Sequence, residues 1–372
     1  MIPYTGEYIE HFDPEKPSLK FYSFTPRPLM RGDMYQMDDE LATLLIEAHR
    51  NIGFLEGLVK YAPNKEAFAE LMLLKECTYS RMIDYDDPDF KEILTIHGTG
   101  KGDITPITNL EMAYKATKNM EVAAPDLSRI CSIALNGESE NNPIDVREHQ
   151  TFWLGAKTNL NGYNPTAPDA VLPALADISA YLYNDHNTDP LIKAALVHYQ
   201  FEMIHPFERY NGIVGRILMP MVLRDTIGEA MLLICLSEYL YHNKNEYFDL
   251  LRTTQYSGGY VRWIKFFVNA VGQAAKQSAE QLMQYEQHII EDLEHLMDIE
   301  NLPKSVFSLY EYLKRCPIIN SSTAAKNIGL SFNSISKAIR VLQEHDIVVQ
   351  ISDTERNRTW KYRAFNMDAD NI

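Results

Sequence analysis

The sequence predicts a mainly α-helical protein with a small β-hairpin and a distinct C-terminal domain. Apolar residues recur at spacings of three and four through residues 38–85 and most of 110–272, which is the period of an α-helix. Glycine, asparagine and proline cluster within residues 150–175, where short apolar runs flank them and predict a hairpin. After Pro303 the pattern changes to short helices followed by strand-rich segments.

The 372 residues are sufficient for two or three domains, each with its own core. Changes in pattern divide the chain into an N-terminal arm with helices, a helical core, a connector helix and a C-terminal domain, at residues 1–100, 101–272, 273–302 and 303–372. Five prolines within residues 1–35 predict an extended surface arm, and breaks over residues 86–104 predict a linker or loop. The alternative for the connector is a dimerising helix, and hence a homodimer.

The composition is that of a globular protein, with 45% hydrophobic and 23% charged residues. A formal net charge of −16 argues against general nucleic-acid binding by the whole chain. Residues 302–372 contain ten Lys and Arg against seven Asp and Glu, a net of +3, so the remainder carries −19. The C-terminal region is therefore mildly basic on an acidic body.

The four cysteines, Cys77, Cys131, Cys235 and Cys316, lie far apart and have no metal-binding spacing. We expect each to be a small buried side chain rather than part of a disulfide or a zinc site. The N-terminus has neither the basic nor the apolar segment of a signal peptide, and no apolar run approaches the roughly 20 residues of a membrane helix. These patterns predict a cytoplasmic protein without a membrane partner.

The most informative segment is HYQFEMIHPFERYNGIVGR, residues 198–216. A residue before proline is disfavoured in a helix, so His205 should end one helix. Asn211 is a good N-cap for the next helix, and Gly212 permits close approach of the backbone to a ligand. The free N–H groups of a helix N-terminus bind phosphate. The spacing therefore places a proton acceptor six residues from a phosphate-binding helix start.

Each of these residues also has a structural interpretation. His205 at a helix C-terminus has its charged form favoured by the helix dipole, and Asn211 is also an ordinary N-cap. Arg216 is alternatively a surface or ion-paired arginine. Because its neighbours are apolar, we expect Arg216 to be partly buried and to need a partner. The occurrence of these residues together at this spacing favours the functional interpretation.

This segment resembles the signature of the Fic (Fido) family, H-P-F-x-[DE]-G-N-G-R-x-x-R, whose members typically transfer AMP from ATP to a protein hydroxyl. Six positions agree with it: His205, Pro206, Phe207, Asn211, Gly212 and Arg216. The resemblance implies a helical Fic core with a β-hairpin flap, and His205 as the catalytic base. It also implies a nucleotide site that includes Phe207, Asn211, Gly212 and Arg216, in which Arg216 holds the terminal phosphate of ATP.

Three positions depart from the signature. Arg209 replaces the acidic residue that coordinates Mg²⁺, Tyr210 replaces the first glycine, and Ile213 replaces the first arginine. The reversed charge predicts that Mg²⁺ is not held as in the family, with the adjacent Glu208 as an alternative ligand. Loss of one such electrostatic contact costs ~10²–10³-fold in rate. The resemblance therefore implies weak or changed AMP transfer; the alternative is an inactive scaffold that senses a nucleotide or partner.

Two further segments resemble regulatory and target-binding parts of the family. Ser80 and Asp84 match the spacing of an inhibitory helix, [ST]-x-x-x-E-[GN], whose acidic residue pairs with the last motif arginine. The alternative is a plain helix C-terminus. Trp153 and Leu154 fall in the flap, which pairs with an extended segment of a target protein by adding a strand. Simple core packing is the alternative for this aromatic residue.

Residues 236–251 resemble the family's helix over the adenine pocket, which implies that Asn243 and Tyr247 lie near the adenine. The nucleotide expected there is ATP.

Residues 303–365 resemble a winged helix-turn-helix, with a short second helix at 321–328 that Ser321 or Ser322 caps. The recognition helix is expected at 333–344, with wing strands at 347–350 and 360–363. Its polar face and the wing offer candidate DNA contacts: Asn333, Ser334, Ser336, Lys337, Arg340, Arg356, Arg358, Lys361 and Arg363. The alternative is a protein-interaction or dimerisation module of the same fold.

Overall fold

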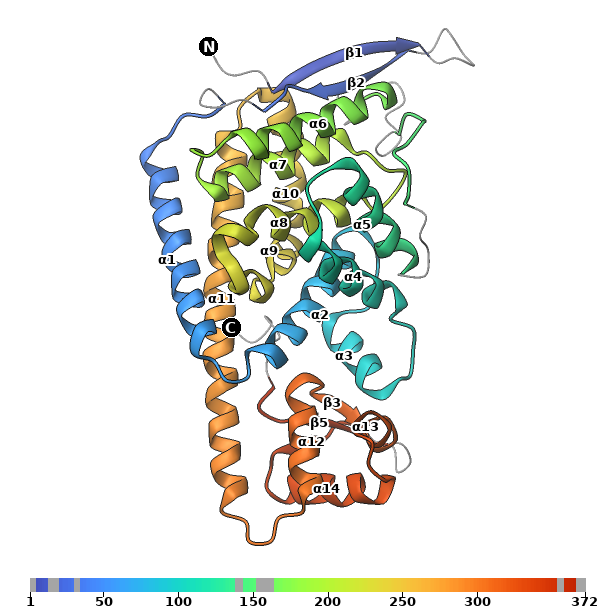
Figure 1. Ribbon diagram of the computed structural model, residues 1–372, viewed down its shortest axis with the longest axis vertical. Helices are drawn as coiled ribbons and strands as arrows, with labels where there is room; N and C mark the ends of the chain where they lie inside the picture. The colour runs from blue at the N-terminus through green and yellow to red at the C-terminus, as the bar shows by residue number, and fades with distance from the viewer. Residues whose placement is uncertain are drawn as a thin grey trace.

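The computed structural model describes residues 5–12, 20–29, 34–137, 143–151, 164–352 and 358–365. Helices dominate it, and the two sheets are small and antiparallel (Figure 1). The prediction of a mainly α-helical protein is therefore confirmed. Trp153, Leu154 and Arg356 lie outside the described residues. Residues 152–163 of the hairpin expected at 150–175 lie there too. That hairpin does not extend to 175, because helix α6 begins at Pro168.

The N-terminal segment is a hairpin rather than an extended arm. Strands β1 (Gly6–Phe12) and β2 (Lys20–Pro26) pair antiparallel, with Gly6 opposite Pro26. Phe24 is completely buried, and its backbone exchanges hydrogen bonds with the segment that precedes α6: its N–H donates to the carbonyl of Asn164, and its carbonyl accepts from the Thr166 hydroxyl. The prolines that suggested an arm lie mostly outside the two strands.

Three helices follow the hairpin: α1 (Asp39–Tyr61), α2 (Lys65–Asp84) and α3 (Phe90–Thr99). The linker expected over 86–104 is wrong, because it contains α3. The residues that suggested a break are the ends of this short helix. Asp89 caps its first turn by accepting from the N–H of Glu92, and Gly100 ends it with φ 65°.

The core consists of helices α4 to α10 around the central pair α7 and α8. Apart from two 3₁₀ turns, its elements are α4 (Thr105–Ala116), α5 (Ala124–Asn136), α6 (Pro168–Asn184), α7 (Pro190–Ile204), α8 (Asn211–Ile227), α9 (Leu236–His242) and α10 (Lys244–Ser257). Helix α7 is buried on nearly every side, as expected of a helix without a polar face. The turn that joins α7 to α8 is therefore held at the centre of the molecule.

Helix α11 (Val261–Met297) spans 37 residues and runs the length of the molecule beside α1 (Figure 1). The boundary expected between a core ending at 272 and a connector starting at 273 falls inside this one helix. Trp263 and Phe267 in its first part are buried. Gly272 is also buried, and it packs closely against Ala48 of α1. The proposed connector is thus the continuation of a core helix.

The C-terminal domain contains α12 (Lys304–Arg315), β3 (Ile318–Asn320), α13 (Ser321–Ile328), α14 (Phe332–Glu344), β4 (Val348–Gln350) and β5 (Thr359–Tyr362). Its sheet has the order β3-β5-β4. The cap of α13 is Asn320 rather than Ser321 or Ser322, because the Asn320 side chain accepts from the N–H of Thr323 at 2.8 Å. Val341 of α14 is only half-buried.

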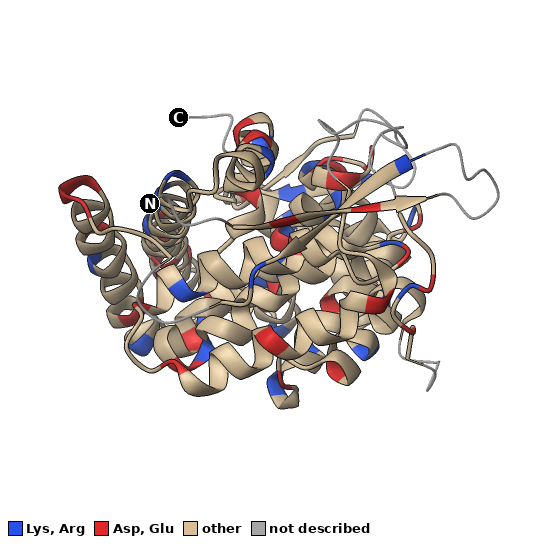
Figure 2. Cartoon of the chain, turned by 90° about the horizontal axis from the view of Figure 1, so that it is seen from above, with Lys and Arg blue, Asp and Glu red and all other residues tan. Residues whose placement is uncertain are grey.

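Charged residues of both signs are interspersed along the helices and strands, with uncharged residues between them (Figure 2). All four cysteines are free and buried, as predicted. No helix in the described part of the chain combines the length and the apolar character needed to span a membrane.

The hairpin should contribute to stability through Phe24. We expect Phe24→Ala to lower the free energy of unfolding by about 3–5 kcal/mol, because it empties a fully buried site. Phe12→Ala on the same hairpin is the control: its side chain is 56% exposed, and the change should stay within about 0.5 kcal/mol. Chemical denaturation measures both, and equal small effects would show that the hairpin does not pack on the core.

Candidate functional site

The turn between α7 and α8 begins at His205, which ends α7 as predicted. Its backbone is left-handed, with φ 52° and ψ 63°, and its N–H donates to the carbonyl of Phe201 at 2.9 Å. The following Pro206 disfavours continuation of the helix. Few residues other than glycine adopt this conformation, so the surrounding structure must stabilise it.

Arg147 supplies that stabilisation, and the sequence analysis missed it. Arg147 is 2% exposed. Its Nε donates to the carbonyl of His205 at 2.7 Å, and its backbone N–H donates to the carbonyl of Pro206 at 2.9 Å. Its guanidinium also bonds the carbonyl of Ile204 at 3.1 Å. One arginine thus satisfies carbonyls that the end of α7 leaves without partners.

Burial and the nearby Arg147 charge lower the pKa of His205 to about 4. The imidazole is therefore neutral at pH 7, and it becomes charged only when the pH falls below about 4. A neutral imidazole is the form that accepts a proton. The site thus has a proton acceptor across the whole physiological pH range.

Asn211 closes the turn from the other side, but it is not the N-cap that the sequence predicted. It is the first residue of α8, and its side chain bonds both backbone groups of Phe207: Oδ1 accepts from the N–H at 2.8 Å, and Nδ2 donates to the carbonyl at 2.7 Å. The N-cap position belongs to Tyr210. Phe207 is completely buried and points inward, as expected.

Arg216 is buried one turn into α8 and meets the end of α2. Its side chain is 1% exposed, Nε donates to the hydroxyl of Ser80 at 2.8 Å, and Nη2 lies 2.5 Å from Oδ2 of Asp84. Burial opposes the charged form, yet the Asp84 carboxylate holds the pKa of Arg216 above its usual value. The structure thus brings together the three residues that the spacing had linked.

Gly212 makes room for this ion pair. A Cβ atom at Gly212 would lie 2.9 Å from Oδ2 of Asp84 and 3.0 Å from Nη1 of Arg216. The expected close approach at Gly212 is therefore made here by a carboxylate of the same chain. This carboxylate lies at the N-terminus of α8, where the helix dipole favours an anion.

Tyr210 makes a second contact between this turn and α2. Its hydroxyl accepts from Nη1 of Arg81 at 2.6 Å, and Arg81 also forms an ion pair with Asp87 and lies 4.4 Å from the ring centre of Tyr85. The backbone of Tyr210 is left-handed, with φ 69°. Glycine takes this conformation without strain, so a tyrosine here depends on its side-chain contacts.

The body of α2 is fixed to the core by buried polar groups. Lys75 and Glu238 form an ion pair of 2.7 Å, with side chains 0% and 2% exposed. Glu76 accepts from the N–H of Ser237 and from the hydroxyl of Tyr114, each at 2.8 Å. Only the last turn of α2, which carries Ser80 and Asp84, faces the site.

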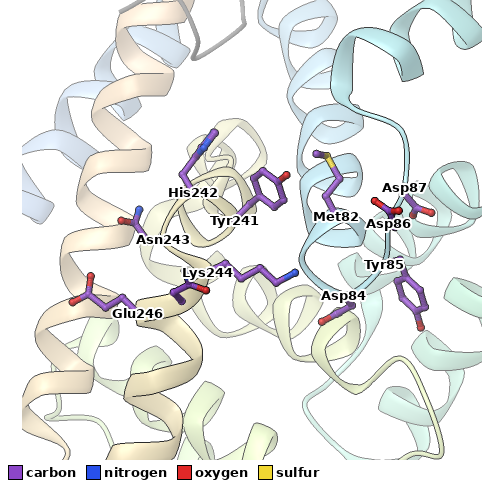
Figure 3. A pocket seen from close by; sticks show the side chains of 11 residues that line it. Met82, Asp84, Tyr85, Asp86, Asp87, Tyr241, His242, Asn243, Lys244 and Glu246 are labelled. Atoms are coloured by element: carbon purple, nitrogen blue, oxygen red, sulfur yellow. The ribbon is translucent and has the colours of Figure 1, made fainter. Parts of the chain in front are cut away.

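A pocket of about 850 Å³ lies between the end of α2 and the segment joining α9 to α10 (Figure 3). Asp84 and Asn243 both line it, and the side chain of Lys244 extends across it toward the α2 side. Tyr247, which we expected near the adenine, does not line this pocket. It is 1% exposed, and its hydroxyl bonds Nε2 of His198 at 2.8 Å inside the core.

Two of the residues that depart from the motif lie in opposite surroundings: Arg209 is exposed, and Ile213 is completely buried. Glu208, the alternative ligand for Mg²⁺, is also exposed. Within the described residues there is no group of three or more His, Cys, Asp or Glu side chains that holds a metal ion. The carboxylate at the motif position is replaced by a cation, so the residues present do not fit the Mg²⁺ site that the resemblance implies.

Comparisons with known proteins agree with this geometry. The Fic/DOC family model matches residues 89–223. The chain is 39% identical over 64 residues to a protein adenylyltransferase of Caenorhabditis briggsae, covering 16% of this chain and 12% of that protein. It is 30% identical over 115 residues to a probable protein adenylyltransferase of Aquifex aeolicus, covering 31% of this chain and 32% of that protein. The chain thus spans a third or less of these relatives.

The fold is similar to a solved structure. A Fic family protein from Desulfovibrio desulfuricans aligns with a TM-score of 0.57 at 16% identity, over 90% of this chain and 99% of that one. The matched segment contains the α7–α8 turn, with His205 at its start and Arg216 beyond it. Residues 89–223 of this chain are therefore a Fic/DOC domain.

Proposed function

We propose that this chain is a Fic-type protein AMP transferase with weak or altered activity, whose nucleotide site is closed by its own helix α2. The observation that carries the proposal is the ion pair between the buried Arg216 and the partly exposed Asp84 at the start of α8. It occupies the helix N-terminus that the family uses for nucleotide phosphates. The names of the curated relatives support AMP transfer as the general reaction.

In this reaction a hydroxyl oxygen of the target attacks the α-phosphorus of ATP. The new bond links AMP to the target, the bond between the α-phosphorus and its bridging oxygen breaks, and pyrophosphate leaves. His205 accepts the hydroxyl proton, and its lowered pKa keeps it ready to do so. No step is assigned to Mg²⁺. The target segment is expected to dock at the flap, including Trp153 and Leu154.

The same contacts explain the inhibition. Two nitrogens of the Arg216 guanidinium are in use: Nε donates to the Ser80 hydroxyl, and Nη2 donates to the Ser80 carbonyl and to Asp84. A terminal phosphate reaches Arg216 only after the last turn of α2 has moved. Because the Lys75–Glu238 and Glu76 contacts fix the rest of α2, opening is expected to unwind residues 80–85 rather than displace the whole helix.

A second candidate function is DNA binding by residues 303–365. Their three helices and β3-β5-β4 sheet follow the order of a winged helix-turn-helix. Asn333, Lys337 and Arg340 are exposed on α14, and Ser334 is half-buried. This exposed polar face supports recognition of a groove by α14, and Arg358 supports contact with the backbone. The alternative role, an inactive sensor that acts through this domain, would keep the closed site and lack transfer.

The ion pair is tested by Asp84→Ala, with Asp86→Ala in the same pocket as the matched control. Removing the carboxylate leaves a buried charge, so stability should fall by about 1–3 kcal/mol, less than for a fully buried pair because Asp84 is 25% exposed. ATP should then raise the melting temperature of Asp84→Ala more than that of the native chain, because it binds only the folded state. Equal melting temperatures of the native and Asp84→Ala chains, with equal shifts on adding ATP, would refute the inhibitory role of Asp84.

Nucleotide binding is expected to be largely independent of Mg²⁺, because Arg209 stands where the family has its carboxylate. Calorimetric titration of ATP into the Asp84→Ala chain should give affinities that agree within tenfold with and without Mg²⁺. Arg209→Asp in the same background should make binding Mg²⁺-dependent. If Mg²⁺ raised the ATP affinity tenfold or more in the chain that retains Arg209, Glu208 or another carboxylate would be identified as the ligand of the metal.

Self-modification with labelled ATP is expected to be near the detection limit in the native chain. The triple change Arg209→Asp, Tyr210→Gly, Ile213→Arg restores the family pattern and should raise labelling by roughly 10²-fold or more. Adding His205→Ala should abolish it. Robust labelling of the native chain that His205→Ala removes would mean that the departures from the motif do not limit the reaction.

A further inference from the structure

A groove of about 290 Å³ lies in the C-terminal domain, where α13, α14 and β5 meet near the lower end of Figure 1. Polar side chains from all three segments line it: Ser321, Ser322, Ser336, Arg340, Arg358 and Trp360. It shares no residue with the pocket beside Asp84. Its volume is at the lower end of the range for small-ligand sites.

Two arginines from separate segments converge on this groove without a counter-charge. Arg340 comes from α14, and Arg358 directly precedes β5. Within the described residues neither forms an ion pair, and no carboxylate lines the groove. In the same domain Arg363 pairs with Asp346 at 3.1 Å. Two like charges at one groove favour a bound anion.

The N-terminus of α13 adds hydrogen-bond donors to the same groove. The Asn320 cap satisfies the N–H of Thr323. The two preceding N–H groups, of Ser321 and Ser322, have no partner within the helix, and both residues line the groove. Their hydroxyls offer two further donors. A helix start with free N–H groups favours an anion.

Trp360 provides an independent sign that a ligand is missing. It lines the groove and is 6% exposed, and its indole Nε1 has no hydrogen-bond partner among the described residues. An indole N–H only donates, and leaving it buried and unpaired costs free energy. An acceptor oxygen bound in the groove would relieve this cost. Ile339 beside it makes part of the groove apolar.

We propose that this groove binds a phosphate ester. Two guanidinium forks, a helix N-terminus and several hydroxyls match an anion with multiple oxygens, and the apolar part of the groove accommodates the organic portion of the ester. The phosphate is supplied either by a small phosphorylated molecule or by a DNA backbone. The groove shares no residue with the pocket beside Asp84, so it does not depend on AMP transfer. A DNA backbone as the source of the phosphate rests on the DNA-binding function proposed above.

Trp360 fluorescence tests the proposal on the full chain. The probes are inorganic phosphate, deoxyribose 5-phosphate and a 20-base-pair DNA duplex, and Trp360→Phe identifies the signal among the three tryptophans. We expect saturable binding of at least one ester. Arg340→Gln and Arg358→Gln should each weaken it tenfold or more. The melting temperatures of these variants should not fall, since within the described residues neither arginine has an ion pair to lose.

Arg363→Gln is the matched control, because it removes the same charge from the same domain at an arginine that is already paired. It should change the affinity for deoxyribose 5-phosphate less than twofold; it is not a control for the duplex, because Arg363 is itself a candidate DNA contact. Saturation by deoxyribose 5-phosphate identifies a small-molecule site. Binding of the duplex alone identifies a DNA-backbone site, provided that changing both Arg340 and Arg358 to Gln reduces the slope of log affinity against log salt concentration by about two. Absence of binding by every probe, or an equal effect of Arg363→Gln, would overturn the proposal.

Discussion

The site depends on one constraint: the charge of Arg216 is buried and must be neutralised. An unpaired buried charge is strongly destabilising, so an anion has to occupy the N-terminal end of α8 in the folded protein. In this structure the anion is the Asp84 carboxylate, and Gly212 leaves the space for it. The inhibition and the nucleotide binding that we propose are then two ways of meeting the same requirement, since a phosphate would neutralise the same guanidinium.

The rest of the site holds the groups around this pair in place. Arg147 fixes the end of α7, and Asn211 ties the turn back to Phe207. Tyr210 occupies a left-handed position suited to glycine, and its bond to Arg81 attaches the turn to α2. Asn211 and Arg216 match the family signature, whereas Arg147 lies outside it and Tyr210 is one of its departures. The other two departures, Arg209 and Ile213, concern metal and phosphate. We infer that the closed state is better preserved than the catalytic chemistry.

The sequence was sufficient for features that depend on local spacing. His205 before a proline and Arg216 among apolar residues led to correct positions, because short-range sterics and charge determine them. The contact of Ser80 and Asp84 with Arg216 was expected only from the resemblance to the family's inhibitory helix. Features that depend on distant contacts were not predictable. Arg147 belongs to an irregular segment with no motif. Glu238, which pairs with Lys75, and Ser237, which donates to Glu76, lie some 160 residues further along the chain. Asn211 was misassigned because its side chain bonds backward to Phe207.

The proposed opening is tested most directly by hydrogen exchange along α2 with and without ATP. If ATP displaces Asp84 from Arg216, amides of residues 80–85 should exchange faster in its presence, while those of residues 65–78, fixed by Lys75 and Glu76, stay unchanged. Unchanged exchange at 80–85 under saturating ATP, or faster exchange along the whole helix, would contradict the account.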